Sequence, residues 1–233
     1  MTPSRSTGFT LVELLVALFV LSLVAILSWR GLDGMVRTQA QTQERADEVL
    51  AAQVGLAQWK TDLDALVQLP QLTALDWDGR VFRLTRRNPA DPGDGVRVTA
   101  WTQRNVNGRG TWLRWQSPPL RTRGEVQEAW ARAGAWAENA GDADRAREVP
   151  VLPLSEWQLY YHRGGAWTNP QSRDAARVDP ATAAAAAAQP GARAQPPLPD
   201  GIRLVLVLPP GHPLAGQVSV DWASPGQGGG RSS

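Results

Sequence analysis

One ionisable side chain stands inside a long apolar segment near the N-terminus. Residues 9–29 contain a single charged residue, Glu13. They are long enough to cross a bilayer as a helix, which takes about 20 residues for roughly 30 Å of hydrocarbon. A carboxylate in such a segment costs roughly 2.5 to 3.5 kcal/mol near the centre of the bilayer and less near its edge. Glu13 is therefore either an acid that reaches the headgroups at the cytoplasmic edge or a partner for a positive charge inside the membrane.

The other residues that could do chemistry form no catalytic or metal-binding pattern. The two histidines, His162 and His212, lie outside any HExxH motif, and the one lysine, Lys60, is not part of a phosphate-binding loop. The chain has no cysteine, which excludes disulfides, thiol nucleophiles and cysteine-based zinc sites. We therefore expect no enzymatic activity, no catalytic residue, no metal site and no cofactor.

Two short segments combine acids with glycine, as calcium loops do. They are Asp-Trp-Asp-Gly at 76–79 and Asp-Pro-Gly-Asp-Gly at 91–95. Both lack the series of oxygen ligands that follows in a complete calcium loop. Because Asp and Gly also favour tight turns, we interpret both segments as turns and keep calcium binding as the alternative.

The charge balance argues against a nucleic-acid partner. The 24 basic and 22 acidic residues of this 233-residue chain leave a formal net charge of +2, and the arginines are scattered among acids. A nucleic-acid-binding surface would normally concentrate basic residues on one face. The length allows one domain with its own core plus appendages.

The apolar segment is predicted to be a transmembrane helix rather than a secretory signal. No small-residue cleavage site follows residues 9–29, whereas a small residue, Gly8, precedes them. Residues 1–8 contain Arg5 and no acid. The positive-inside rule therefore keeps the N-terminus in the cytoplasm and sends the bulk of the chain outward.

Residues 30–69 predict an amphipathic continuation of this helix. Apolar residues recur there at spacings of three and four, and Pro70 ends the pattern. Gly31 and Gly34 mark a local weak point, since each costs about 1 kcal/mol relative to alanine in a helix. The predicted helix runs from about residue 9 to residue 67. Its apolar stripe, interpreted as a sheet-packing face, contains Val49, Ala52, Leu56, Trp59, Leu63 and Leu66.

Beyond Pro70 the pattern changes to the period of two that is typical of strands. Strands are predicted at 80–85, 96–102, 111–116, 156–162, 202–208 and 217–222, with a short helix at 124–140. We expect residues 70–223 to form a β-rich domain that contains a low-complexity Ala/Pro loop at 171–200, followed by a disordered tail at 224–233. The predicted fold class is α+β, a long N-terminal helix packed on antiparallel sheets.

The 11 tryptophans admit two interpretations. They either pack the core of the β-rich domain or form a surface that faces a partner. Core packing is favoured. Trp112 and Trp115 are three residues apart, so they face opposite sides of a strand, and a sheet covered on one side would fully bury only one of them. The other members considered are Trp101, Trp130 and Trp136.

The residues from Gly8 to Leu18, Gly-Phe-Thr-Leu-Val-Glu-Leu-Leu-Val-Ala-Leu, resemble the cleavage and methylation motif of type IV prepilins and pseudopilins. The resemblance implies that residues 1–8 are a leader, which a prepilin peptidase removes between Gly8 and Phe9. It also implies that the new amino group of Phe9 is methylated and that Glu13 pairs with this amino group, usually on a neighbouring subunit. The implied fold is pilin-like.

The later segments are similar to the J-type minor pseudopilin of the type II secretion system. The similarity lies in the strand and aromatic turn at 157–167 and in the Leu-Pro-Asp-Gly-Ile entry to the strand that ends at Leu208. It implies a structural subunit of the pseudopilus tip, anchored in the inner membrane by one helix, with its C-terminal domain in the periplasm. The implied partners are other minor pseudopilins, the prepilin peptidase, the inner-membrane assembly platform and membrane lipid.

Two alternatives remain. A minor pilin of a type IV pilus or competence system shares every N-terminal feature, and the neighbouring genes would discriminate it from a secretion subunit. A signal-anchored periplasmic enzyme or ligand-binding module would require a convergent polar cleft. The sequence shows neither a nucleophile paired with a base nor a cluster of metal ligands for such a cleft.

Overall fold

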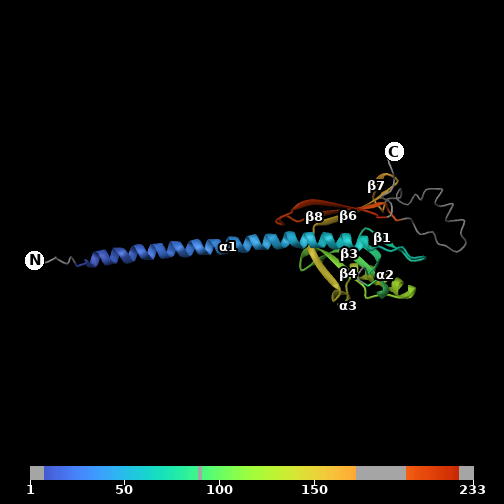
Figure 1. Cartoon of the computed structure of the whole chain (residues 1–233), viewed down its shortest axis with the longest axis horizontal. Coiled ribbons are helices and arrows are strands. Elements are labelled where there is room, and N and C mark those ends of the chain that lie inside the picture. The colour runs from blue at the N-terminus through green and yellow to red at the C-terminus, as the bar shows by residue number, and fades with distance from the viewer. Residues whose placement is uncertain (1–7, 89–90, 172–197, 226–233) are drawn as a thin grey trace, which may run out of the picture. The chain divides into compact units, whose positions relative to one another are not determined.

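A computed structural model describes residues 8–88, 91–171 and 198–225 of the chain. The chain forms two compact units, residues 1–47 and 48–233. Helix α1 (Leu11–Asp64) is the first element, and it is unbroken at Gly31 and Gly34, so the predicted weak point does not interrupt it (Figure 1). Its bounds confirm the long helix predicted at 9–67 to within three residues at each end. Most of the predicted loop and tail, residues 172–197 and 226–233, lie outside the described residues.

Five antiparallel strands form the first sheet, called sheet A. In spatial order they are β1 (Leu75–Trp77), β2 (Val81–Arg87), β3 (Val96–Val106), β4 (Arg109–Gln116) and β5 (Glu148–Pro153). Strands β3 and β4 are joined by Asn107 and Gly108, both with positive φ (52° and 82°), as in the two-residue turns that suit a hairpin. This tight turn lets β3 extend beyond its predicted end at 102.

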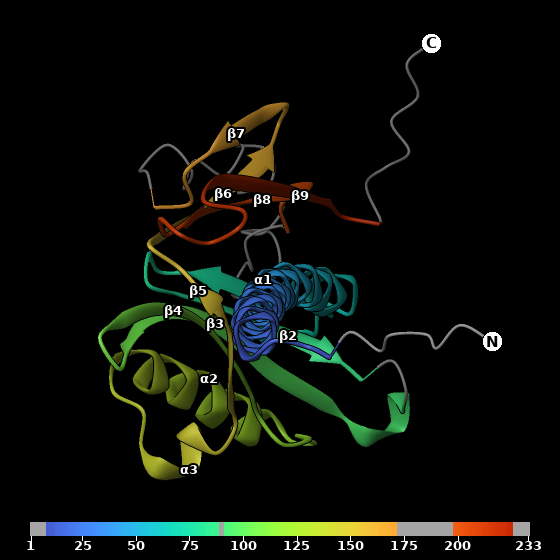
Figure 2. The same ribbon diagram turned by 90° about the vertical axis from the view of Figure 1, so that its left-hand side faces the viewer.

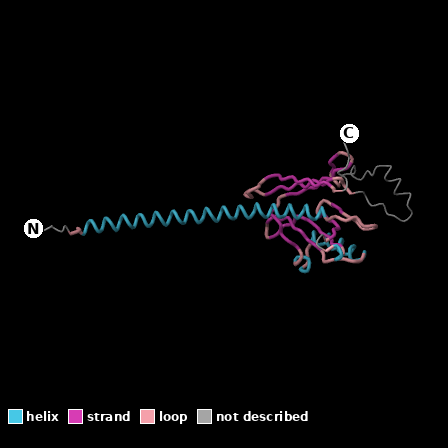
Figure 3. The backbone as a smooth tube through the Cα atoms, viewed as in Figure 1, coloured by secondary structure: helices cyan, strands magenta, loops and turns pink. Residues whose placement is uncertain are grey.

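Four further antiparallel strands form sheet B, in the order β7-β6-β8-β9. They are β6 (Glu156–Arg163), β7 (Ala166–Thr168), β8 (Gly201–Leu208) and β9 (Gly216–Ala223). Figure 3 shows the strands of both sheets in magenta and the helices in cyan. The strands predicted at 156–162, 202–208 and 217–222 are confirmed within one residue at each end.

Among the described residues, three further helical elements lie between the strands of sheet A. Helix α2 (Arg123–Glu138) confirms the helix predicted at 124–140, and η1 (Pro92–Asp94) and α3 (Asp142–Arg145) were not predicted. A capping box starts α2: the Thr122 side chain accepts from the Glu125 N–H, and the Glu125 carboxylate accepts from the Thr122 N–H.

The strands that pattern analysis missed are β1, β5 and β7. Two of them are three residues long, and β5 contains Pro150 and Pro153. A segment of three residues is too short to display alternation, and proline argues against a strand when only local sequence is considered.

Sheet A is buried on both faces. One face packs against the C-terminal part of α1 and, beyond it, sheet B, and the other face packs against α2 (Figure 2). Trp112 belongs to the first core and Trp115 to the second, and both are fully buried. The assumption of a sheet covered on one side was therefore wrong. The core interpretation of the tryptophans is confirmed for Trp101 and Trp136 as well, while Trp130 is partly buried.

The predicted stripe of α1 is the face that enters the core. Trp59 and Leu63 are almost fully buried, and Leu56 packs against the same cluster. Gly55 allows the helix to approach sheet A closely, because a Cβ at this position would meet the side chain of Val151. The stripe therefore acts as a sheet-packing face, as predicted.

Candidate functional site

The Gly8–Phe9 peptide bond lies in exposed, non-helical backbone directly before α1. Helix geometry begins at Leu11, and the Phe9 side chain is 88% exposed. A Cβ added to Gly8 would meet no atom within 4 Å. The fold of the chain therefore does not require glycine at this position. A requirement for glycine would come from another molecule that binds or cleaves the Gly8–Phe9 bond.

Thr10 and Glu13 form a capping box at the start of α1. The Thr10 N–H and hydroxyl each donate to Glu13 Oε2 at 2.9 Å, and the Glu13 N–H donates to Thr10 Oγ1 at 3.3 Å. Each side chain thus accepts a hydrogen bond from the backbone N–H of the other residue. The helix dipole also favours a carboxylate in the first turn of a helix. Sequence analysis missed this pair, although the Thr-x-x-Glu pattern was visible.

The residues around the capping box make the N-terminal part of α1 apolar on all sides. This part is long and apolar enough to cross a membrane, and its large apolar side chains, from Phe9 to Trp29, are exposed in the isolated chain. An exposed apolar surface all round a helix is typical of a segment that is buried in lipid or against other helices. Glu13 is the one charged group that this surface contains.

The arrangement can bring an amine and a carboxylate together. Phe9 directly precedes Thr10, whose N–H already donates to Glu13. Cleavage before Phe9 would therefore create an α-amino group beside the capping box, at the apolar N-terminal end of α1. Both charges are costly in hydrocarbon, so each would gain from pairing with an opposite charge there.

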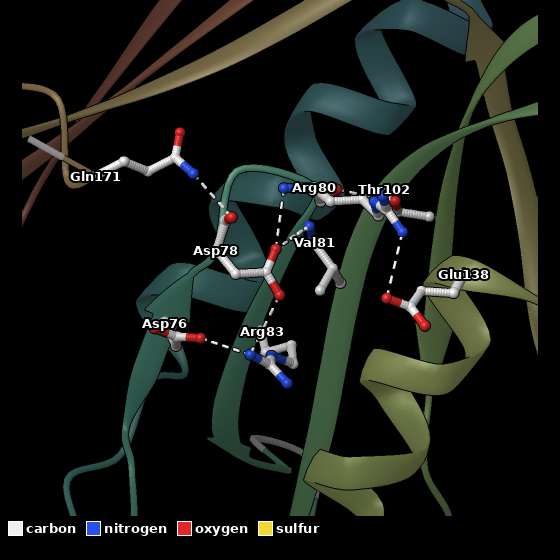
Figure 4. A network of polar contacts seen from close by, with 8 residues as sticks. All are labelled: Asp76, Asp78, Arg80, Val81, Arg83, Thr102, Glu138 and Gln171. Atoms are coloured by element: carbon white, nitrogen blue, oxygen red, sulfur yellow. Dashed lines mark hydrogen bonds and ion pairs between the residues drawn. The ribbon is translucent and has the colours of Figure 1, made fainter.

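The first acidic turn is held together by its own side chains (Figure 4). Asp78 Oδ1 accepts from the N–H groups of Arg80 at 2.9 Å and Val81 at 2.8 Å. Arg83 Nη2 lies 2.6 Å from Asp76 Oδ2 and 3.4 Å from Asp78 Oδ2. The arginine thus supplies the counter-charge for both acids, and the turn interpretation accounts for their positions.

The second acidic turn is built in the same way. Asp91 precedes η1, and its Oδ1 accepts from the Gly93 N–H at 3.1 Å. Asp94 Oδ2 pairs with Arg97 Nη2 at 2.9 Å. In the described part of the chain, no three His, Cys, Asp or Glu side chains are grouped so that they could hold a metal ion.

The histidines and the lysine are not brought together. His162 Nδ1 lies 3.7 Å from Asp200 Oδ2 and its ring contacts Trp167 edge-on. His212 is buried in the β8–β9 turn, where its Nδ1 accepts from the Leu214 N–H at 3.0 Å. Lys60 is exposed on α1. These three residues therefore do not share a site.

Among the described residues, the acid that is buried in the core is Asp62, which was not singled out from the sequence. It is fully buried in the last turn of α1 and accepts from Trp101 Nε1 at 2.9 Å and from Arg114 Nε at 2.8 Å. Gln58 donates at 2.9 Å, and Arg86 also pairs with the carboxylate. An acid inside the apolar stripe, three residues after Trp59, was the signal that could have revealed it.

Asp64 makes the corresponding link to sheet B. Its Oδ1 accepts from Trp222 Nε1 of β9 at 2.8 Å. The last turn of α1 therefore contacts sheet A through Asp62 and sheet B through Asp64. These two carboxylates position the last turn of α1 between the sheets.

Comparison with known families identifies a motif at the N-terminus. Residues 3–29 match the family model described as the prokaryotic N-terminal methylation motif. The matched segment contains Gly8, Phe9 and Glu13 together with the part of α1 that is long and apolar enough to cross a membrane. No match was found among curated protein sequences. The chain thus carries the N-terminal motif of type IV prepilin-like proteins, joined to a long helix and antiparallel sheets.

Proposed function

We propose that this chain is a minor pseudopilin of the type II secretion system, most similar to the J-type component. The observation that carries the proposal is the methylation motif at the start of a helix that can span a membrane and that continues into a β-rich unit. In this role the protein is a structural subunit of the pseudopilus tip and catalyses no reaction. It takes part in the secretion of proteins across the outer membrane.

Assembly would follow from the chemistry of the N-terminus. A prepilin peptidase removes residues 1–8, the released amino group of Phe9 is methylated, and α1 stays in the inner membrane. The amine of one subunit then pairs with Glu13 of a neighbour. This pairing offsets the cost of two charges in hydrocarbon and sets the axial position of each subunit.

The C-terminal unit supports the assignment to a minor subunit of the secretion system. Strands β6 and β8 pair along their length, and the Leu-Pro-Asp-Gly-Ile sequence enters β8, as in the J-type pattern. The large domain would lie in the periplasm, where other minor pseudopilins and the assembly platform are its partners. A minor pilin of a type IV or competence pilus is the second candidate, because it would start with the same motif.

The first experiment tests the charge pair. A C-terminally tagged chain is expressed in its native cell as wild type, Glu13→Val and Glu44→Val, the last being a control acid exposed on the same helix. We expect Glu13→Val to be processed but to lose co-isolation of other pilin-like subunits, whereas Glu44→Val retains it. Equal co-isolation from all three chains would contradict the proposed pairing.

The second experiment separates the two candidate systems. Deletion of the gene should abolish the secretion of folded proteins into the medium and leave pilus-dependent motility and DNA uptake intact. Re-expression of the wild-type chain should restore secretion, and the Glu13→Val chain should not. Loss of motility or DNA uptake with normal secretion would assign the chain to a pilus instead.

A further inference from the structure

The apolar surface of α1 ends at Trp29 and Arg30. Between Glu13 and Arg30 the chain contains no charged residue, and from Asp33 onward charged and amide side chains are frequent. The helix itself continues without a break across this point. The boundary is therefore chemical: one continuous helix passes from a surface that suits lipid to a surface that suits water.

The two side chains at this boundary are exposed, and Trp29 is 75% exposed. In the part of the chain that the structure describes, the Trp29 indole makes no hydrogen bond and Arg30 makes no ion pair. Asp33 lies about one turn beyond Arg30, but its carboxylate pairs with Arg37 at 3.0 Å. The boundary therefore presents an indole N–H donor and an uncompensated cation on adjacent residues.

Phospholipid headgroups offer acceptors for both of these groups. A tryptophan at a membrane–water boundary keeps its apolar ring beside the acyl chains, while its N–H donates to an oxygen of the headgroup region. A guanidinium binds a phosphate through two parallel hydrogen bonds, and its long stem lets it reach the level of the headgroups. The chemistry of the two side chains therefore matches a lipid surface.

The length of the apolar part of α1 fits the same assignment. From Leu11 to Trp29 the helix rises about 27 Å at 1.5 Å per residue, close to the roughly 30 Å of hydrocarbon in a bilayer. With Trp29 at the outward boundary, the start of the helix lies at the cytoplasmic boundary. Glu13 Oε2 accepts from the Thr10 N–H, so the carboxylate points back to that end. It would therefore lie near the cytoplasmic boundary rather than at the centre of the bilayer.

We propose that Trp29 and Arg30 bind phospholipid headgroups of the outward-facing leaflet and thereby set the depth of Glu13 before the subunit assembles. Arg30 contacts the phosphate, and the Trp29 indole donates to an oxygen at the same level. The two contacts hold the Glu13 carboxylate and the amino group released at Phe9 near the inner headgroups, where a charge costs less than at the bilayer centre. The inference rests on the proposed function for the orientation of the chain and for the removal of residues 1–8.

The absence of cysteine allows one spin label to serve as a depth gauge. Gly34→Cys places the label beyond Trp29 on the same helix, where a Cβ would meet no atom within 4 Å. The labelled full chain is reconstituted in vesicles of phosphatidylethanolamine and phosphatidylglycerol. Collisions of the label with oxygen, which is enriched in hydrocarbon, and with a water-soluble nickel chelate give its depth. Because α1 is continuous, a shift at residue 34 is also a shift at Glu13.

The first variant removes both contacts. Trp29→Leu together with Arg30→Leu extends the apolar run to Leu32, and we expect the label to move toward the hydrocarbon by about 4.5 Å, the rise of three residues. Arg37→Gln is the matched control, because Arg37 already pairs with Asp33, and it should leave the depth unchanged. An unchanged depth in the double variant, or an equal shift in the control, would overturn the proposal. All these positions are exposed, so thermal melting in detergent should match that of the labelled parent chain.

A change of lipid tests the phosphate contact itself. Vesicles of digalactosyldiacylglycerol have the same kind of acyl interior but no phosphate. Arg30→Gln should move the label toward the hydrocarbon in the phospholipid vesicles and leave its depth unchanged in the galactolipid vesicles. Equal shifts in the two lipids would mean that Arg30 only marks the end of the apolar run, and would overturn headgroup binding. These measurements need no secretion system, so their failure is distinct from failure of the co-isolation and secretion experiments.

Discussion

The indole Nε1 of Trp101 donates a hydrogen bond of 2.9 Å to Oδ2 of Asp62, inside the core between α1 and sheet A. Asp62 lies in the last turn of the helix, where the helix dipole disfavours a negative charge. Arg86 and Arg114 flank the carboxylate and supply the opposite charge. A buried carboxylate thus ties one helix to three strands of the sheet, and its loss should be costly.

Asp62→Asn tests this role. The amide keeps the size of the side chain and an acceptor oxygen but removes the charge, which leaves Arg86 and Arg114 without their buried partner. We expect the free energy of unfolding to fall by about 3 to 5 kcal/mol. Urea unfolding of the full chain in detergent, followed by tryptophan fluorescence, measures it. Asp64→Asn is the control and should cost at most about 1 kcal/mol, because its amide oxygen can still accept from Trp222. Equal losses from the two variants would contradict the charge argument.

Two tryptophan substitutions compare the stability effect of a core residue with that of a partly exposed residue. Trp112 is fully buried against Trp101 and Trp59, whereas Trp167 is 37% exposed and stacks under Arg203. Trp112→Ala should lower the free energy of unfolding by about 3 to 5 kcal/mol, and Trp167→Ala should lower it by about 1 kcal/mol or less. Thermal melting of both variants gives the comparison. A large loss at Trp167 would mean that this residue supports the fold of sheet B.

Tyr161 makes the stability of the fold sensitive to alkaline pH. Burial, together with the nearby charge of Asp76, raises the pKa of the Tyr161 phenol above its ordinary value of 10.0. Above pH 10 the unfolded chain releases this proton and the folded chain keeps it. The Tyr161 contribution to stability is therefore constant below pH 10 and falls by about 1.4 kcal/mol per pH unit above it.

Tyr161→Phe should remove that slope. The hydroxyl has no hydrogen-bond partner among the described residues, so the variant should match the wild type within about 1 kcal/mol at pH 7. Unfolding midpoints measured between pH 7 and pH 11 compare the two chains. Parallel curves for both chains above pH 10 would show that another group causes the alkaline loss.

Gly8→Leu should block processing without disturbing the fold. A Cβ at this position would meet no atom within 4 Å, so melting should be unchanged, while the leader should remain attached. Intact-mass spectrometry of the chain from the membrane fraction shows whether residues 1–8 are still present. Gly34→Ala is the control, because Gly34 lies within α1, also has open space around it and should leave processing normal. A wild-type chain that keeps residues 1–8 in its native cell would refute the assignment of a leader.

The turn at 76–79 gives a prediction about calcium. Arg83 already pairs with Asp76 and Asp78, and two backbone N–H groups occupy Asp78 Oδ1. We expect millimolar calcium to leave the melting temperature unchanged, and Asp78→Ala to cost about 1 to 3 kcal/mol because two N–H groups lose their acceptor. A calcium-dependent rise in melting temperature that disappears in Asp78→Ala would show that the turn binds the ion.

Much of the fold could be predicted from local sequence. The apolar run at 9–29 and the three-and-four spacing up to Leu66 indicate one long helix, because both patterns repeat with the helical period. Strands β6, β8 and β9 alternate clearly and were found within one residue at each end. Gly8, Phe9 and Glu13 were recognisable because they belong to one contiguous sequence motif, and the Thr-x-x-Glu pattern of the capping box was visible as well.

The pairing of distant segments was decided only by the tertiary structure. Sheet A is covered on both faces because α2, more than 50 residues after α1, folds back onto it, and so Trp112 and Trp115 can both be buried. The role of Asp62 depends on arginines from two different strands. Local periodicity determines which residues turn inward on a helix or a strand. Local periodicity does not determine which residues contact these inward-facing side chains, since those contacts join residues far apart in the chain.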